Sequence, residues 1–132
     1  ILTDGAFNDT AVARLYGYDY VIICSSKDLT NEIEEMITST EIPYKRGLHW
    51  TTDAGYRETW GQVMDYRDKG ALCVEMEGVG LFTIANYRKC VATGIYVVSD
   101  VYSEDDWKLG WEGNDIKRAV GAVIDMIIES IR

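Results

Sequence analysis

Short apolar stretches typical of buried strands alternate with helix-period segments along this chain, and this alternation constrains the fold more than any other feature. The strand-like runs are residues 20–24, 71–76 and 91–99, and the helix-like segments are residues 28–37, 60–70 and 78–88. Runs rich in Val, Ile and Tyr are typical of strands covered on both faces, and intervening helices join such strands in parallel. The pattern therefore predicts an α/β layer structure with a largely parallel sheet.

The C-terminal segment predicts the longest helix. Apolar side chains from Ile116 to Ile131 recur with a period of about 3.6 residues, and Asn114 precedes them as a cap. We expect this helix to lie along the sheet. Asp125 and Glu129 interrupt the apolar run, so it is not long and dry enough to span a bilayer.

Length and charge limit the domain organisation and the partners. The 132 residues fit one domain, residues 1–132, because domains typically have about 100–200 residues. The chain has 22 acidic and 13 basic residues and a net charge of −9. A surface this acidic repels phosphate backbones and anionic lipid headgroups, so we expect neither nucleic acid nor a membrane as partner.

Cysteine usage favours a reducing compartment. Cys24, Cys73 and Cys90 are odd in number, lack CxxC spacing and lie in or beside apolar stretches, which predicts reduced core thiols. There is no signal-peptide pattern, so the expected location is the cytoplasm. The sequence also contains no metal-ligand spacing, Walker loop, GxGxxG or GxSxG motif.

Two acids lie at the end of the strand-like run 71–76. Glu75, Met76 and Glu77 stand where this run gives way to a helix, which places Glu77 at the carboxyl end of a strand, where α/β sheets bind their ligands. An ionised carboxylate there can accept two hydrogen bonds from a vicinal diol such as that of ribose. The alternative is that Glu77 caps its own helix and that Glu75 faces solvent.

Ser99 and Asp100 end the next strand-like run. An acid that leaves so apolar a run is partly desolvated and can hold a proton to donate, although Ser-Asp is also an ordinary turn sequence. A right-handed crossover between the two strands would bring Glu77 and Asp100 to the same edge of the sheet. One acid that binds a sugar and one that protonates a leaving group suit the cleavage of a glycosidic bond to a base.

A polar and aromatic turn, WTTDAGYRET at residues 50–59, precedes the segment 60–70. Its Tyr56 can cover a planar ligand and Arg57 can bind a carbonyl group, or both can serve the turn and its packing. His49 is the only histidine, and we expect it to be a structural or surface residue. The acidic segment 101–113, which contains Trp107 and Trp111, is long enough to form a lid.

These residues resemble the purine nucleoside and uridine phosphorylase family. WTTDAGYRET, GALCVEMEGVGLFTIANYR and VVSD occur in the family's order and spacing. The likeness covers residues 1–100 and extends more loosely to the last helix. It implies a phosphorylase-type, three-layer α/β/α fold with a mostly parallel mixed sheet, of which the amino-terminal half is missing here.

The resemblance also implies roles for site residues. Met76 and Glu77 correspond to the ribose-binding pair and Asp100 to the acid that protonates the departing base. The other implied substrate-binding residues are Tyr56, Glu75 and Ser99. The implied reaction is reversible phosphorolysis of a nucleoside, with nucleoside and phosphate as ligands, phosphate as co-substrate, no cofactor or metal, and a homo-oligomeric assembly.

Three departures from the family pattern keep alternatives open. Gly55 occupies the position where members often carry a base-stacking phenylalanine, so stacking falls to Trp107 or Trp111 or is weakened. No Gln-x-Arg pair follows Tyr56, which mildly favours purine over uracil. The family's phosphate loop lies in the half that is missing, so a nucleosidase-like hydrolase and a silent nucleoside-binding module remain alternatives.

Overall fold

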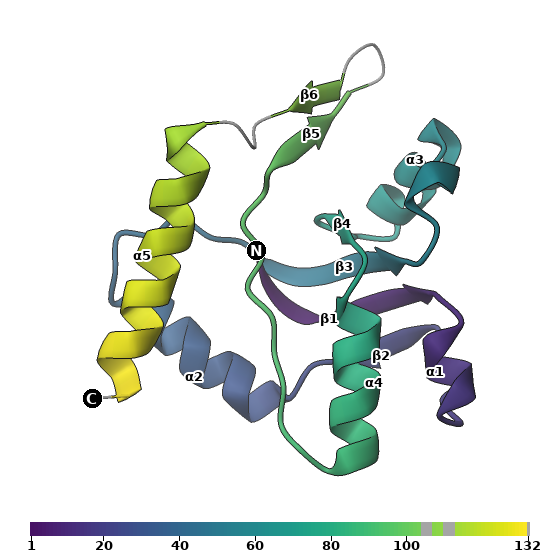
Figure 1. The fold of residues 1–132 in the computed structure, drawn as a ribbon, viewed down its shortest axis with the longest axis horizontal. Coiled ribbons are helices and arrows are strands. Elements are labelled where there is room, and N and C mark those ends of the chain that lie inside the picture. The colour runs from purple at the N-terminus through teal and green to yellow at the C-terminus, as the bar shows by residue number, and fades with distance from the viewer. Residues whose placement is uncertain (104–106, 110–112, 132) are drawn as a thin grey trace.

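A mixed sheet forms the centre of the chain in a computed structural model that describes residues 1–103, 107–109 and 113–131 (Figure 1). Its strands are β1 (Leu2–Asp9), β2 (Ile22–Cys24), β3 (Arg46–Thr52) and β4 (Val74–Glu75), in the order β2-β1-β3-β4. β3 pairs in parallel with both β1 and β4, and β2 pairs antiparallel with β1. The predicted mostly parallel, mixed sheet is confirmed.

The described helices include the four that the periodicity predicts and a short first helix that it does not. They are α1 (Val12–Leu15), α2 (Lys27–Thr38), α3 (Trp60–Asp68), α4 (Gly78–Arg88) and α5 (Asn114–Ile131), and a 3₁₀ turn, η1, spans Gly55–Arg57. A capping box fixes the start of α3, because the Gln62 amide donates to the Thr59 hydroxyl while the Gln62 side chain accepts from the Thr59 amide. None of the described helices is long and apolar enough to cross a bilayer.

Helices cover both faces of the sheet and make a three-layer arrangement. Ala6 and its β3 neighbour His49 face α4, where Phe82 packs against both. The next pair in the register, Phe7 and Trp50, points to the opposite face because side chains alternate along a strand. There the Tyr66 ring of α3 stacks on Trp50 with centroids 4.3 Å apart.

A second cluster of buried side chains joins α2 and α5 to the start of β1. Its members are Leu2, Ile33, Ile37 and Met126. α5 packs against this cluster through Met126 and lies beside α2 in Figure 1, whereas Val120, Ile124 and Ile128 of its predicted apolar stripe stay exposed. The last helix therefore packs beside α2 near the amino end of β1 and does not lie along the sheet as predicted.

Segment 91–99 is not the strand that its composition predicts. It makes one isolated bridge, between Leu2 and Ile95. Its backbone bonds reach residues 1–3 and Ser26: the Thr3 amide donates to the Gly94 carbonyl, and the Ser26 amide donates to the Ala92 carbonyl. A strand needs a continuous ladder, and this segment passes the end of β1 with too short an overlap. The chain then forms a separate antiparallel hairpin of β5 (Asp100–Tyr102) and β6 (Trp107–Leu109).

Two other expectations also need correction. The run 20–24 is a short antiparallel edge strand, not a strand covered on both faces, and the run 71–76 pairs only at Val74–Glu75. The cysteines are free, but Cys24 and Cys90 are exposed and only Cys73 is partly buried, so they are not core thiols.

Candidate active site

A cavity of about 420 Å³ lies between β4 and the segment that leads into β5. Its lining includes the polar or charged side chains of Arg67, Glu75, Tyr96, Ser99 and Asp100. The carboxyl end of β4 and residues 96–101 line this cavity together, although residues 91–99 are not a strand of the sheet and no strand crossover of the predicted kind joins them. The acid that β4 contributes to this lining is Glu75.

Asp100 is the first residue of β5, and only one of its two carboxylate oxygens has a hydrogen-bond partner in the described structure. The Ser99 hydroxyl donates to its Oδ2 atom over 2.6 Å. Its Oδ1 atom is buried and has no hydrogen-bond partner among the described residues. Buried carboxylate oxygens are normally paired, so an unpaired one in a cavity wall is suited to a ligand.

Glu75 is held by hydrogen bonds on both oxygens. His49 Nε2 lies 3.0 Å from Oε1, and the Thr51 hydroxyl donates to the same oxygen. Oε2 accepts from the amides of Glu77 (2.8 Å) and Gly78 (2.7 Å). Burial raises the pKa of this carboxyl, but the donors from His49, Thr51 and the Glu77 amide outweigh burial and bring it to about 2.

His49 is fully buried, so of the two expected roles it has the structural one. Its Nδ1 atom lies 2.6 Å from the Thr3 hydroxyl, and its ring packs against Tyr96 with centroids 4.7 Å apart. Because Nε2 faces a carboxylate, this nitrogen carries a proton. Sequence reasoning did not connect His49 and Thr51 to the acids, although their i, i+2 spacing on a strand places both on one face.

Met76 and Glu77 lie on the surface beside this cavity. Glu77 is the residue that precedes α4, yet its side chain does not cap the helix. Glu75 does so instead, by accepting from the Gly78 amide. Glu77 is therefore exposed, with one oxygen near its own turn at the Met76 amide (3.1 Å), and it is not among the residues that line the cavity.

The turn around Tyr56 approaches the same edge of the sheet. A side-chain carbon added at Gly55 would lie 3.6 Å from the Met76 sulfur, so η1 is in contact range of the Met76–Glu77 turn. The Tyr56 side chain is fully exposed, and Arg57 lines a smaller cavity of about 280 Å³ with Trp50. The side chain of Trp107 and the whole of Trp111 lie outside the described residues.

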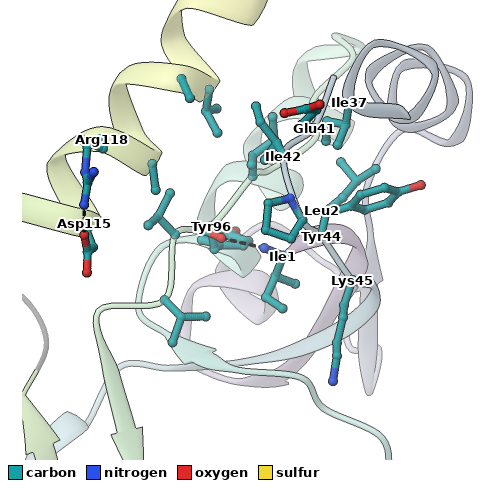
Figure 2. Close-up of a pocket in the computed structure, with 17 residues that line it drawn as sticks. Ile1, Leu2, Ile37, Glu41, Ile42, Tyr44, Lys45, Tyr96, Asp115 and Arg118 are labelled. Carbon is teal, nitrogen blue, oxygen red and sulfur yellow. Dashed lines mark hydrogen bonds and ion pairs between the residues drawn. The ribbon is translucent and has the colours of Figure 1, made fainter. Parts of the chain in front are cut away.

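A larger groove of about 1180 Å³ lies between α5, residues 41–45 and residues 95–98 (Figure 2). Its lining is mostly apolar, with Ile37, Ile42 and Leu2 from the second buried cluster and its surroundings. The ion pair drawn on α5 joins Asp115 and Arg118 to each other. Glu75 and Asp100 line the cavity of about 420 Å³ and not this groove. Among the described residues no cluster of His, Cys, Asp or Glu could hold a metal ion.

Comparison with known proteins identifies the family. A sequence profile described as the phosphorylase superfamily matches residues 1–129. The chain belongs to the phosphorylase superfamily.

Curated relatives in this superfamily are purine nucleoside phosphorylases of the DeoD type. One from Exiguobacterium sp. is 32% identical over 87 residues, which are 66% of this chain and 36% of the relative. One from Shewanella oneidensis is 28% identical over 101 residues, 76% of this chain and 43% of the relative. The chain thus spans less than half the length of the curated superfamily members it matches.

Solved structures share the fold at low sequence identity. The P. knowlesi homologue of P. falciparum PNP superposes with a TM-score of 0.76 at 19% identity, over 97% of this chain and 50% of that one. A uridine phosphorylase from Vibrio fischeri gives 0.65 at 19% identity, over 95% and 49%. The phosphorylase-type fold expected from the sequence is confirmed, with about half of the superfamily's chain represented here.

Proposed function

We propose that this chain carries the nucleoside-binding part of a phosphorylase site, which acts in the reversible phosphorolysis of the N-glycosidic bond of a purine nucleoside or uridine. The observation that carries the proposal is the cavity beside β4, in which the buried Oδ1 atom of Asp100 has no partner within the described structure. Membership of the phosphorylase superfamily supports the reaction class. The DeoD-type relatives favour a purine base.

In this proposal Asp100 is the catalytic acid. As the bond between the sugar and the base stretches, negative charge grows on the base, and a proton from Asp100 stabilises it more in the transition state than in the ground state. Ser99 orients that carboxyl by donating to its other oxygen. General-acid help of this kind is worth roughly 10²- to 10⁴-fold in rate.

Glu77 and Met76 form the ribose contact in the same proposal. Glu77 is exposed and two residues from Glu75 of the cavity wall, so its side chain can turn to a diol that enters from the surface. Met76 and the neighbouring η1 turn, which carries Tyr56, form the outer wall near the sugar and the base. Phosphate is the co-substrate, and no cofactor is required.

Four of the basic side chains in the described structure are held in ion pairs, among them Arg67 of the cavity lining, which faces Asp68 over 3.3 Å. Arg46 is paired with Asp4 and Glu34, Lys69 with Asp65, and Arg118 with Asp115. This observation favours a second candidate, a module that binds nucleoside without turnover, and leaves hydrolysis as a third outcome.

Base release with and without phosphate distinguishes these functions. Inosine and uridine are incubated with the chain, free base is measured by chromatography, and binding is followed by calorimetry. Phosphate-dependent release that Asp100→Asn abolishes supports the proposal, and Asp115→Asn on the exposed start of α5 is the matched control. Release without phosphate indicates a hydrolase, binding without release indicates the module, and absence of binding contradicts both forms of the proposal.

We extend the proposal to assembly and location. Apolar side chains that stay exposed, such as Leu15, Val21 and Val91, suit a surface covered in a homo-oligomer. The three free cysteines suit a reducing compartment such as the cytoplasm. Sedimentation tests the assembly, and a monomer at micromolar concentration would contradict it.

A further inference from the structure

Donors from the protein itself fill the hydrogen-bonding capacity of the Glu75 carboxylate. An ionised carboxylate offers about four lone-pair sites. In this chain, two donors face Oε1, from His49 and Thr51, and two backbone amides face Oε2, from Glu77 and Gly78. A sugar hydroxyl could bind Glu75 only by displacing one of these donors.

The same bonds fix the turn that carries the proposed ribose contact. The amides that Oε2 accepts belong to Glu77 and to the first residue of α4, so Glu75 holds this turn against the end of β4. His49 lies on the neighbouring strand β3 and is fully buried, which gives the carboxylate a rigid anchor. On its other side, the imidazole is anchored to the Thr3 hydroxyl of β1.

The start of α4 packs closely against the His49–Glu75 pair. A Cβ atom at Gly78 would lie 2.5 Å from His49 Nε2 and 2.8 Å from the Tyr96 hydroxyl. Only glycine lets the backbone of α4 approach the His49–Glu75 pair this closely. The Thr51 hydroxyl, which donates to Glu75, also accepts from the Val79 amide at 3.2 Å and so ties the first turn of α4 to β3.

We propose that His49 and Glu75 act as a buried positioning pair, which orients Glu77 toward the ribose through the Glu77–Gly78 backbone, and that Glu75 itself does not contact substrate. This inference rests on the proposed function for the role of Glu77. The orientation of the turn, however, is a property of the chain that can be measured without any ligand.

Amide hydrogen exchange followed by NMR on the ¹⁵N-labelled chain tests the positioning directly. We expect the Glu77 and Gly78 amides to exchange roughly tenfold faster in His49→Leu, because one charge-assisted hydrogen bond to the carboxylate is lost. His49→Gln keeps a side-chain N–H donor and should restore much of the protection. Ile37→Ala, in the second buried cluster, is the control for general destabilisation.

If exchange at Glu77 and Gly78 in His49→Leu is no faster than in Ile37→Ala, the positioning role is wrong. Should His49→Leu not fold, Thr51→Val removes the other donor to Oε1, and the same comparison decides.

A second experiment tests whether the His49–Glu75 pair affects how the chain binds the ribose of a nucleoside. The affinity for inosine relative to 2′,3′-dideoxyinosine reports the diol contact, and we expect this ratio to fall toward one in His49→Leu and to recover in His49→Gln. A merely structural role would weaken both ligands equally and leave the ratio unchanged, which would overturn the proposal. If the wild-type chain itself does not distinguish the two ligands, the ribose role of Glu77 fails, while the exchange experiment still decides the positioning.

Discussion

His49 Nε2 lies 3.0 Å from Glu75 Oε1, and the imidazole is fully buried while the carboxyl side chain is 11% exposed. This contact joins β3 to the end of β4. Glu75 also binds the backbone amides of the turn that begins α4. Burying a charged group is costly unless it is paired and hydrogen-bonded, and here both partners are. The pair therefore contributes to stability and to the shape of the proposed site together.

The depressed pKa of Glu75 predicts a loss of stability in acid. Its folded-state pKa of about 2 lies below the ordinary value of 4.5, so the folded state favours the ionised form. This contribution is fully present above pH 4.5 and is lost as the pH falls toward 2, by about 2–3 kcal/mol in the free energy of unfolding. Urea unfolding at several pH values measures it. Glu75→Gln lacks the titrating group, and an equally steep decline in that variant would contradict the assignment.

Substitutions at two glycines of α4 should change stability in opposite directions. Gly78→Ala places a Cβ atom 2.5 Å from His49 Nε2, so we expect the free energy of unfolding to fall by about 2 kcal/mol or more. Gly80→Ala meets nothing within 4 Å, and alanine is the better helix former by roughly 0.5–1 kcal/mol, so stability should rise. Thermal unfolding by circular dichroism checks both. Equal effects would show that the close approach at Gly78 is not needed.

Arg46 should be the most important surface-facing cation for stability. Its guanidinium bonds Asp4 of β1 at 2.7 Å and Glu34 of α2 at 2.5 Å, so it joins three elements. Arg46→Met should lower the free energy of unfolding by about 1–2 kcal/mol, because hydrogen bonds to charged groups are lost at a partly buried site. Arg67→Met, at an exposed pair with Asp68, should change it by less than about 0.5 kcal/mol. Similar losses in urea titrations of both variants would refute this ranking.

Asp100→Asn should separate binding from turnover in the proposed reaction. The amide keeps the shape of the side chain but cannot donate an acidic proton, so base release should fall roughly 10²- to 10⁴-fold. Nucleoside affinity by calorimetry should change far less, since the sugar contact assigned to Glu77 is untouched. A variant that releases base at the wild-type rate would remove Asp100 from the catalytic role.

Local patterns predicted the helices well. The period of 3.6 from Ile116 to Ile131 and the cap at Asn114 agree with α5, and Thr59 with Gln62 marks the start of α3. Helix hydrogen bonds close within a few residues, so the sequence of one segment contains most of the information that its helix needs.

Strands could be predicted less well, because a strand depends on its neighbour. Residues 91–99 have strand composition, yet one bridge at Ile95 is all the pairing they find in the described chain. The run 20–24 does pair, but antiparallel and at the edge. The sequence of one segment does not specify which strand it pairs with, or how many residues the pairing covers.

The sequence by itself determined the α/β class, the family likeness, and the neighbourhood of Asp100 and the acids that follow Val74. The tertiary structure decided which of these acids is buried and hydrogen-bonded and which is exposed. It buried Glu75 against His49, which is 26 residues away in the chain, and left Glu77 exposed. Hydrogen bonds of this kind depend on which side chains the register of β3 and β4 brings face to face, and that register is set by the whole sheet.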